Sequence, residues 1–277
     1  MNKIKITSWN IEGRLGEKSP IYRGSSENIL DFIQILNSDI VILPEAHQFD
    51  SILDHTEVTS QLKQLGYEIY EVPYDDDLHL RNDTNIKQLS LCLLSKIKIK
   101  EFKTIRLGKL RNAFVAITDS KTPIRIIGIH LDDRNEETRI NQMTDLITII
   151  NSSDMPTIMA GDFNTMHGSD LWPSKLLRLW PVRFLAKFII PDLSVRATEM
   201  ARGEAIKLLE SQTKLIDADP KHQPTSTPKT RTHLNLPSIR LIQIDHIFIS
   251  HKIKINKFAV MSDGGSDHRA ITANIIF

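Results

Sequence analysis

The stretch MAGDFNT, residues 159–165, places a carboxylate and an amide two positions apart, just after a short apolar run. Residues 156–160 are predicted to form a buried strand, with Gly161 as the point where the chain turns out of it. On an extended strand end, Asp162 and Asn164 project to the same side, because side-chain direction repeats every two residues. Together they can orient a water molecule and hold an anionic oxygen. The alternative is an Asx-type turn without a catalytic role. The choice between these two interpretations depends on the other motifs of the chain.

Similar polar residues follow other predicted strands. The first strand ends at Asn10, and the second, residues 40–43, is continuously apolar and leads into Glu45. A carboxylate at the end of a buried strand fits a hard cation, although a solvent-exposed Glu45 would need none. A later strand ends at His130. A lone histidine in that position is more often structural, but this one is the third polar strand end in a series.

The C-terminal part supplies two more polar positions. Residues 241–249 are predicted to form a strand with Asp245 in its middle, and a buried carboxylate needs a partner because burying it alone is costly. Residues 264–268 form a tight loop before the last strand, and this loop carries His268. A loop histidine that faces a buried carboxylate has a fixed orientation and a stabilised protonated form.

Hydrophobic periodicity outlines the remaining elements. Apolar residues at helical spacing predict helices, and closely spaced strand-like runs in the middle of the chain indicate antiparallel pairing within mixed sheets. The predicted helices cover residues 29–36, 55–65 and 140–150, and the further strands cover 67–72, 89–95, 97–105, 113–118, 124–129 and 270–277.

Composition sets broader bounds. The chain has 277 residues, 40% of them hydrophobic, which is enough for one large domain or two small ones. Because 35 Lys+Arg nearly balance 34 Asp+Glu, any basic surface must be local. The single Cys92 lies in an apolar run, which predicts a buried structural thiol and excludes a disulfide within the chain. No window is long and apolar enough for a transmembrane helix, and a cytoplasmic location is expected.

Six short motifs, in order, resemble those of the endonuclease/exonuclease/phosphatase superfamily, which includes pancreatic deoxyribonuclease and the abasic-site endonucleases. The resemblance spans nearly the whole chain, and six motifs in order are far more specific than any one of them. The motifs are SWNI at residues 8–11, LPE at 43–45, GIHL at 128–131, GDFN at 161–164, IDHI at 244–247 and SDH at 266–268.

The resemblance implies a four-layer α/β sandwich, in which two mixed β-sheets pack face to face with helices outside. It implies a single domain over residues 1–277 that hydrolyses phosphoesters with magnesium or manganese. Asn10 and Glu45 would hold the metal ion, with Asp267 as a further ligand. Pro44 departs from the family pattern, which commonly has Gln before this Glu, and it removes an amide that often helps to fix the carboxylate.

The same resemblance implies catalytic roles. Asp162 would orient or deprotonate the attacking water, and His268, supported by Asp245, would stabilise the pentacoordinate transition state. Asn164 and His130 would hydrogen-bond the phosphoryl oxygens. Apart from the resemblance, Arg134 and Arg139 can hold a phosphate, although a solvated helix start explains these two arginines nearly as well.

The substrate is less defined. A nuclease or a nucleic-acid end-processing phosphodiesterase is favoured by a small margin over a lipid or inositol phosphate phosphoesterase, and a non-catalytic binding module on the same fold is the rival outside the enzymes. The acidic residues 75–77 argue against extensive duplex binding. The basic loop at residues 221–233 can hold a nucleic-acid backbone, or it is a solvated connector with prolines.

An insertion at about residues 167–204 is longer and more apolar than a minimal sandwich needs. Between residues 171 and 190 aromatic side chains are interleaved with basic ones, and there is no acidic residue. Three functions suit this mixture: stacking single-stranded bases, lying on an anionic membrane surface, or docking a partner. The alternative is that the apolar groups pack on the sandwich. We expect the segment to form a lid or wall over the substrate.

Overall fold

The structure is a computed structural model that describes residues 3–11, 26–47, 55–73, 89–108, 111–167, 196, 198–226, 242–261 and 266–277. The expectations for the acidic residues 75–77 and for the segment 171–190 lie outside these ranges. Most of the basic loop also lies outside them, although residues 221–226 are described.

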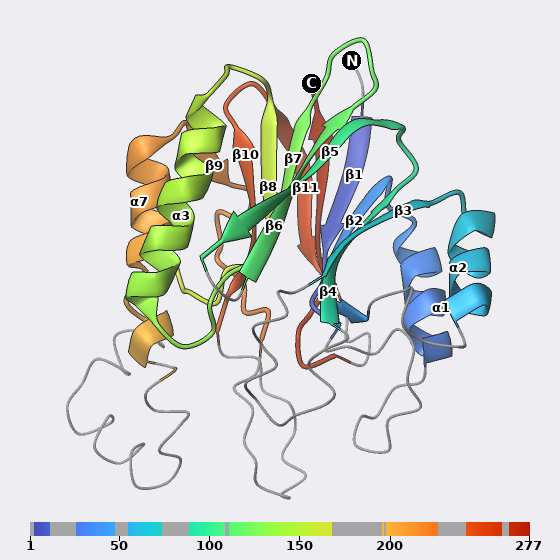
Figure 1. Ribbon diagram of the computed structural model, residues 1–277, viewed down its shortest axis with the longest axis horizontal. Coiled ribbons are helices and arrows are strands. Elements are labelled where there is room, and N and C mark those ends of the chain that lie inside the picture. Colours follow the sequence, from blue (N-terminus) through green and yellow to red (C-terminus); the bar gives the residue numbers. More distant parts are fainter. Residues whose placement is uncertain are drawn as a thin grey trace, which may run out of the picture.

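Two six-stranded sheets form the centre of the described chain (Figure 1). Both are mixed, because β1 pairs in parallel with β2, and β7 with β8, whereas the other neighbours are antiparallel. The first sheet has the order β11-β12-β1-β2-β4-β3, with strands Lys254–Val260, Ile271–Ile276, Lys3–Ser8, Ile40–His47, Leu89–Ser95 and Glu68–Pro73. The second has the order β5-β6-β7-β8-β10-β9, with strands Ile99–Leu107, Arg111–Thr118, Arg125–His130, Thr157–Asp162, Asp245–Ser250 and Leu215–Asp217.

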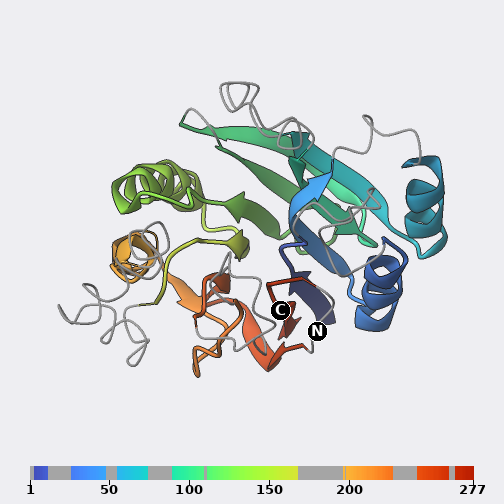
Figure 2. The same ribbon diagram turned by 90° about the horizontal axis from the view of Figure 1, so that it is seen from below.

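Helices cover the outer face of each sheet, which completes the four layers (Figures 1 and 2). Helices α1 (Ser26–Leu36) and α2 (His55–Gln64) bury their apolar faces on the first sheet. Helices α3 (Glu136–Asn151) and α7 (Glu204–Gln212) do so on the second. Asn135 caps α3 by accepting hydrogen bonds from two backbone N–H groups of its first turn. The predicted four-layer α/β sandwich is confirmed.

The central core lies between the two sheets. It combines inward-facing side chains of both, such as Ile6 and Leu93 from the first sheet and Phe114 and Ile126 from the second, all fully buried. Burying a side chain of this size stabilises the fold by about 1.5–3 kcal/mol. Gly128 leaves room for the Phe114 ring, since a Cβ there would lie 2.1 Å from it. This core fixes the strands whose ends carry the polar motifs.

The structure corrects several expected boundaries. Strand β8 does not end at Gly161 but continues to Asp162. Gly161 instead permits a close approach, because its φ is 150° and a Cβ would lie 1.9 Å from the carbonyl oxygen of Ile129. Asp245 is the first residue of β10 and not a mid-strand residue. Helix α7 and strands β9 and β11 had no counterpart among the expected elements.

The polar motifs meet at one edge of the sandwich. The ends of β1, β2, β7 and β8 and the start of β10 lie at the lower edge in Figure 1, which faces the viewer in Figure 2. Trp9, just after β1, holds the segment before β12 there, because its indole N–H donates to the carbonyl oxygen of His268 at 3.2 Å. Among the described residues, no helix has the length and apolar character needed to cross a bilayer.

Candidate active site

Strand register brings His130, Asp162 and Asp245 side by side. His130 on β7 is the register partner of Asp162 on β8, and Asp162 is the partner of Asp245 on β10. All three side chains are buried. His130 Nε2 lies 3.7 Å from Asp162 Oδ2, and Asn10 donates from Nδ2 to the same oxygen at 3.0 Å. Residues from both sheets therefore surround one carboxylate.

His268 and Asp245 form the expected pair. His268 Nδ1 lies 2.8 Å from Asp245 Oδ2, which also accepts a hydrogen bond from the Thr225 hydroxyl at 2.7 Å. On its other side, His268 Nε2 lies 3.9 Å from Asp162 Oδ2. Burial opposes the charged imidazole, but the carboxylates of Asp245, Asp267 and Asp162 outweigh burial and raise the pKa of His268 well above its ordinary value. The imidazolium form is therefore favoured.

The surroundings of Asp162 change the pKa of its carboxyl group. Burial, and next the neighbouring Asp245 carboxylate, raise the pKa of Asp162 from 3.8 to about 7. A carboxylate with a pKa near neutrality can exchange a proton with water at physiological pH. Its position fits a general base.

The pair of acids also fits a cation. Asp245 Oδ1 is buried without a hydrogen-bond partner in the part of the chain that the structure describes. Asp162, Asp245 and His268 place potential ligand atoms within 4.8 Å of one another, and because the imidazolium form of His268 has no lone pair for a metal, the two carboxylates are the members of this group that suit a cation. A cation near Asp162 and Asp245 would offset the repulsion between the two carboxylates.

Asn164 lies in a tight turn and not on an extended strand end. Its φ is 50°, and its backbone N–H donates to Asp162 Oδ1 at 2.9 Å, which is the Asx turn weighed as the alternative. The predicted same-side projection from an extended strand is therefore wrong. The Asn164 side chain donates from Nδ2 to the carbonyl oxygen of Leu131 at 3.1 Å. The turn holds Asp162 and Asn164 next to the end of β7.

Glu45 reaches the site through an irregularity in β2. The register of β2 against β4 shifts between Leu43 and Ala46, and Glu45 has a φ of 55°. Bulges of this kind re-aim a side chain out of the regular alternation. Glu45 Oε1 consequently lies 3.8 Å from His130 Nε2. Asp267, the other acid predicted to bind metal, has Oδ1 3.8 Å from His268 Nε2.

His130 is held in the neutral form. Burial, followed by the positive charges of Arg111 and His268, lowers the pKa of His130 well below its ordinary value. A neutral imidazole has one N–H donor and one acceptor nitrogen, so His130 can donate a hydrogen bond without carrying charge. It differs in this from His268, the other buried imidazole beside Asp162.

The two arginines predicted to bind substrate differ in placement. Arg134 is exposed in the loop after β7, and its role stays a prediction. Arg139 is fully buried in α3, where its Nε donates to Glu136 Oε2 at 2.6 Å and its Nη1 to the carbonyl oxygen of Asp132. The structure therefore does not bring Arg139 to the site. Its guanidinium instead stabilises the start of α3. These internal contacts are found where a contact with a phosphate was expected.

Sequence reasoning missed three contributors. Thr225 supports Asp245, Arg111 acts on His130 electrostatically, and Ser266 donates to the carbonyl oxygen of Asn10 at 2.7 Å. Arg111 lies two residues before the predicted strand at 113–118 and is the first residue of β6 in the structure. Nothing near Thr225 in the sequence indicates its contact, which depends on how the loop after β9 folds back.

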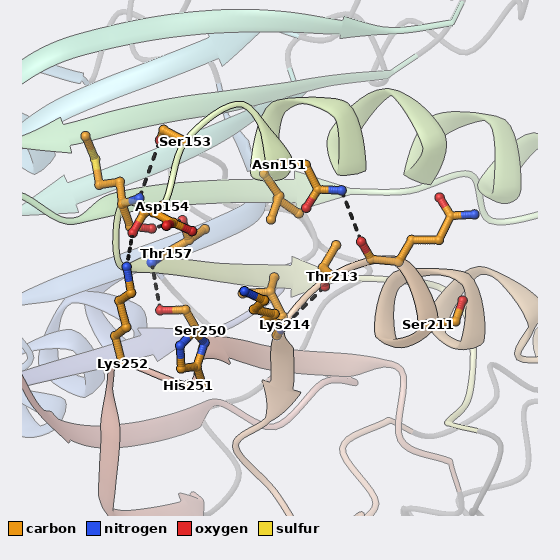
Figure 3. A pocket seen from close by; sticks show the side chains of 14 residues that line it. Asn151, Ser153, Asp154, Thr157, Ser211, Thr213, Lys214, Ser250, His251 and Lys252 are labelled. Carbon is orange, nitrogen blue, oxygen red and sulfur yellow. Dashed lines mark hydrogen bonds between the residues drawn. The ribbon is translucent and has the colours of Figure 1, made fainter.

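A pocket of about 440 Å³ lies at the opposite edge of the second sheet, between the C-terminal ends of α3 and α7 (Figure 3). Thr157 and Ser250, which line it, are at the far ends of β8 and β10 from Asp162 and Asp245. Lys252 there donates to the carbonyl oxygen of Asp154 at 2.7 Å (Figure 3). None of the predicted site residues lines this pocket, so it is separate from the candidate active site.

The comparison with protein families decides the identity of this site. A model described as the endonuclease/exonuclease/phosphatase family matches residues 7–268, which includes all the polar strand ends described above. The chain belongs to the endonuclease/exonuclease/phosphatase family. This is a family of phosphoester hydrolases. His130, Asp162 and His268, which lie close together, are therefore candidates for the groups that take part in phosphoester hydrolysis. No curated protein matched the sequence.

Solved structures share the fold at low sequence identity. A 2′,3′-cyclic phosphatase, ANGEL2, superposes with a TM-score of 0.66 at 17% identity, covering 99% of this chain and 95% of that one. TDP2 from D. rerio, complexed with a single-strand DNA product, gives 0.64 at 16% identity with both chains fully covered. A mannosyl-6-phosphatase from Bacteroides thetaiotaomicron gives 0.63 at 15% identity, covering 99% of this chain and all of that one.

The altered pKa of Asp162 has a consequence for stability. Between its ordinary value of 3.8 and about 7, the unfolded chain releases a proton that the folded chain keeps, so folded-state stability falls as pH rises through this window. Asp162→Asn removes this loss. In the metal-free protein we expect the variant to have a higher midpoint of thermal unfolding than the wild type, with a larger difference at about pH 8 than at about pH 5. An equal difference at both pH values would contradict the pKa assignment.

Proposed function

We propose that this protein is a divalent-metal-dependent phosphodiesterase that acts on nucleic acid, as a nuclease or as an end-processing enzyme. The proposal rests on the polar groups that surround one carboxylate oxygen. Asp162 Oδ2 lies 3.0 Å from Asn10 Nδ2, 3.7 Å from His130 Nε2 and 3.9 Å from His268 Nε2. A base and several hydrogen-bond donors thus face the same small volume, which suits the attack of water on a phosphorus atom.

Magnesium or manganese fits the oxygen ligands at this edge. Asn10 and Glu45 would hold the ion, with Asp267 as a further ligand, because amide and carboxylate oxygens are preferred by hard divalent cations. The orphaned Asp245 Oδ1 beside Asp162 is consistent with a cation nearby. When bound, the ion would polarise a phosphoryl oxygen and neutralise developing negative charge.

The protein's own groups divide the remaining work. Asp162, with a pKa of about 7, accepts the proton of the attacking water. His268, whose protonated form Asp245 favours, places positive charge beside the non-bridging oxygens as their charge increases. Neutral His130 and the Asn164 amide donate hydrogen bonds to the same oxygens, since an amide NH₂ group has two donors and the contact with Leu131 uses one of them.

Two of the related structures favour nucleic acid as the substrate class. TDP2 was solved with a single-strand DNA product and ANGEL2 with adenosine-2′,3′-vanadate. The mannosyl-6-phosphatase keeps a sugar phosphate as the second candidate, and lipid or inositol phosphates are the alternative from the sequence. The cytoplasmic location, and a partner or membrane contact through residues 171–190, stay predictions.

A substrate panel tests the proposal. Labelled DNA and RNA ends, abasic DNA, cyclic phosphate ends, sphingomyelin, inositol phosphates and mannose 6-phosphate would be compared by kcat/KM in the presence of magnesium. We expect the highest values with the nucleic acids. Exclusive turnover of a lipid, inositol or sugar phosphate would overturn the nuclease proposal and leave the phosphoesterase assignment intact.

Glu45→Gln tests the metal assignment. Because an amide oxygen is a weaker ligand than a carboxylate for a hard cation, we expect the magnesium concentration for half-maximal activity to rise about 10–100-fold. At saturating magnesium, kcat should stay within a few-fold of the wild type. Glu71→Gln is a matched control, since Glu71 lies on β3 at the far edge of the same sheet. An unchanged magnesium requirement in Glu45→Gln would remove Glu45 from the ligand set.

A further inference from the structure

The turn at residues 162–164 is followed by Thr165, a fully buried residue that is held through its side chain and through its backbone. The Thr165 hydroxyl lies 3.2 Å from Glu136 Oε2, and the Thr165 carbonyl oxygen lies 3.3 Å from His246 Nε2. Glu136 belongs to α3, and His246 belongs to β10. A helix and a strand therefore both anchor the residue at which the turn ends.

Glu136 is a fully buried carboxylate that several groups hold in place. Its Oε1 accepts hydrogen bonds from the backbone N–H groups of Glu204 at 2.6 Å and Ala205 at 2.9 Å, at the start of α7. Gly203, the N-cap residue of α7, makes no side-chain cap, so Glu136 takes this role from the neighbouring helix (Figure 1). Arg139 pairs with the same carboxylate through Nε at 2.6 Å. The carboxylate is thus a fixed acceptor for a further donor.

His246 is held in a similar way on the β10 side. Its Nδ1 lies 2.9 Å from Asp217 Oδ2, and its ring packs edge to face against the ring of Phe163, with 5.2 Å between the centroids. Its side chain is fully buried. Because a carbonyl oxygen only accepts hydrogen bonds, His246 Nε2 is the donor to Thr165. Asp217 therefore orients the ring, and the ring holds the backbone of Thr165.

The turn before Thr165 needs support from its surroundings. Asn164 has a φ of 50°, a left-handed backbone conformation that is uncommon outside glycine. Such a conformation persists where the surrounding structure enforces it. The Asn164 N–H donates to Asp162 Oδ1 at 2.9 Å, so the shape of the turn also sets the position of the Asp162 carboxylate. A displacement of Thr165 would be passed directly to both residues.

We propose that Glu136 and His246 are positioning residues, which hold Thr165 from two sides and thereby fix the turn that carries Asp162 and Asn164. The inference rests on the proposed function, in which these two turn residues act on the attacking water and on the phosphoryl oxygens. Misplacing a reacting group by about 1 Å can lower a rate by about 10²-fold. Loosening the turn should therefore lower kcat, with little change in KM because the predicted metal ligands belong to other elements.

Thr165→Val tests the contact with Glu136. Valine has nearly the same shape but no hydroxyl, so we expect kcat for bis-p-nitrophenyl phosphate to fall about 10–100-fold, with KM and the magnesium requirement within a few-fold of the wild type. Thr165→Ser keeps the hydroxyl and should retain kcat within a few-fold. Thr157→Val is the matched control, because Thr157 is also buried, lies at the other end of β8 and donates to the carbonyl oxygen of Met155 at 2.9 Å. Its kcat should match the wild type.

Two substitutions of His246 separate its contacts. The amide nitrogen of asparagine can replace Nδ1 and keep the contact with Asp217, whereas the amide nitrogen of glutamine can replace Nε2 and keep the contact with Thr165. We expect His246→Asn to lower kcat about 10–100-fold and His246→Gln to stay closer to the wild type. The reverse order would show that His246 does not act through Thr165, and would overturn its positioning role.

Hydrogen–deuterium exchange follows the turn without relying on activity. The peptide that contains residues 162–166 should exchange faster in Thr165→Val than in the wild type and in Thr165→Ser, whereas a peptide from β12 should not change. Circular dichroism checks that each variant is folded, and Thr165→Ala replaces Thr165→Val if the latter is not.

Equal exchange of the peptide at residues 162–166, or a lower midpoint of thermal unfolding in Thr165→Val with an unchanged kcat, would overturn the proposal and leave Glu136 and His246 with a purely structural role. A folded wild type without turnover on any substrate would overturn the proposed function instead. The exchange experiment would then still decide whether Glu136 and His246 hold the turn.

Discussion

Asp162→Asn is expected to lower kcat for phosphoester hydrolysis by about 10²–10⁴-fold, the usual contribution of a general base. Asparagine keeps the size of the side chain and can still accept the hydrogen bond from the Asn164 backbone, but it cannot take a proton from water. The same substitution should stabilise the metal-free protein at neutral pH. Loss of activity together with gain of stability is therefore the expected signature of this residue.

Asp132→Asn is the control for this experiment. Asp132 lies in the loop after His130, where Oδ1 accepts from the backbone N–H groups of Arg134 and Asn135. An asparagine can accept the same hydrogen bonds, so kcat should stay within a few-fold of the wild type. Rates for Asp162→Asn that match those of Asp132→Asn would show that another group activates the water.

His268→Ala is the second large effect, with an expected fall in kcat of about 10²–10³-fold, as for removal of one donor to a developing oxyanion. His268 Nε2 lies on the same side as Asp162 Oδ2, and its Nδ1 is fixed by Asp245. Alanine removes both the positive charge and the hydrogen bond. The loss should appear in kcat more than in KM, because the charge on the phosphoryl oxygens increases only towards the transition state.

Asp245→Asn gives a finer test of the same pair through the pH profile. The Asp245 carboxylate helps to raise the pKa of His268 above its ordinary value, so the imidazolium persists to higher pH in the wild type. Without that carboxylate the pKa of His268 should fall, and the alkaline limb of the kcat profile should move to lower pH. An alkaline limb that does not move in Asp245→Asn would mean that His268 does not act as the protonated group.

Much of the fold followed from local patterns. The apolar run at residues 40–43 indicated a strand buried on both faces, and the structure places it in the middle of a sheet with no exposure. Helical spacing located α1, α2 and α3. The residues that follow the buried strands are polar although the strands themselves are apolar, and packing alone does not require this. That contrast made most of the candidate site predictable from the sequence.

The missed elements have identifiable physical causes. Strand β11, KINKFAV, is at the sheet edge, and β9 has three residues, so neither buries a continuous apolar face that a pattern could indicate. The turn at Asn164 and the bulge at Glu45 depend on left-handed φ values in non-glycine residues, which the sequence does not signal. For Arg139 the sequence offered a phosphate contact or a solvated helix start, and neither of these indicated the buried pair that Arg139 forms with Glu136, one helical turn away. The single domain over residues 1–277 stays a prediction.

The central claim is that the strand ends of this sandwich form a metal-dependent phosphodiesterase and not a binding surface on an inactive fold. Hydrolysis of bis-p-nitrophenyl phosphate by the wild type and by Asp162→Asn, each with magnesium or manganese and each with chelator, tests it most directly. We predict turnover by the wild type with metal, loss of that turnover with chelator and its return on adding metal, and almost none from the variant. Chelator-insensitive turnover, or equal turnover by wild type and variant, would contradict the claim.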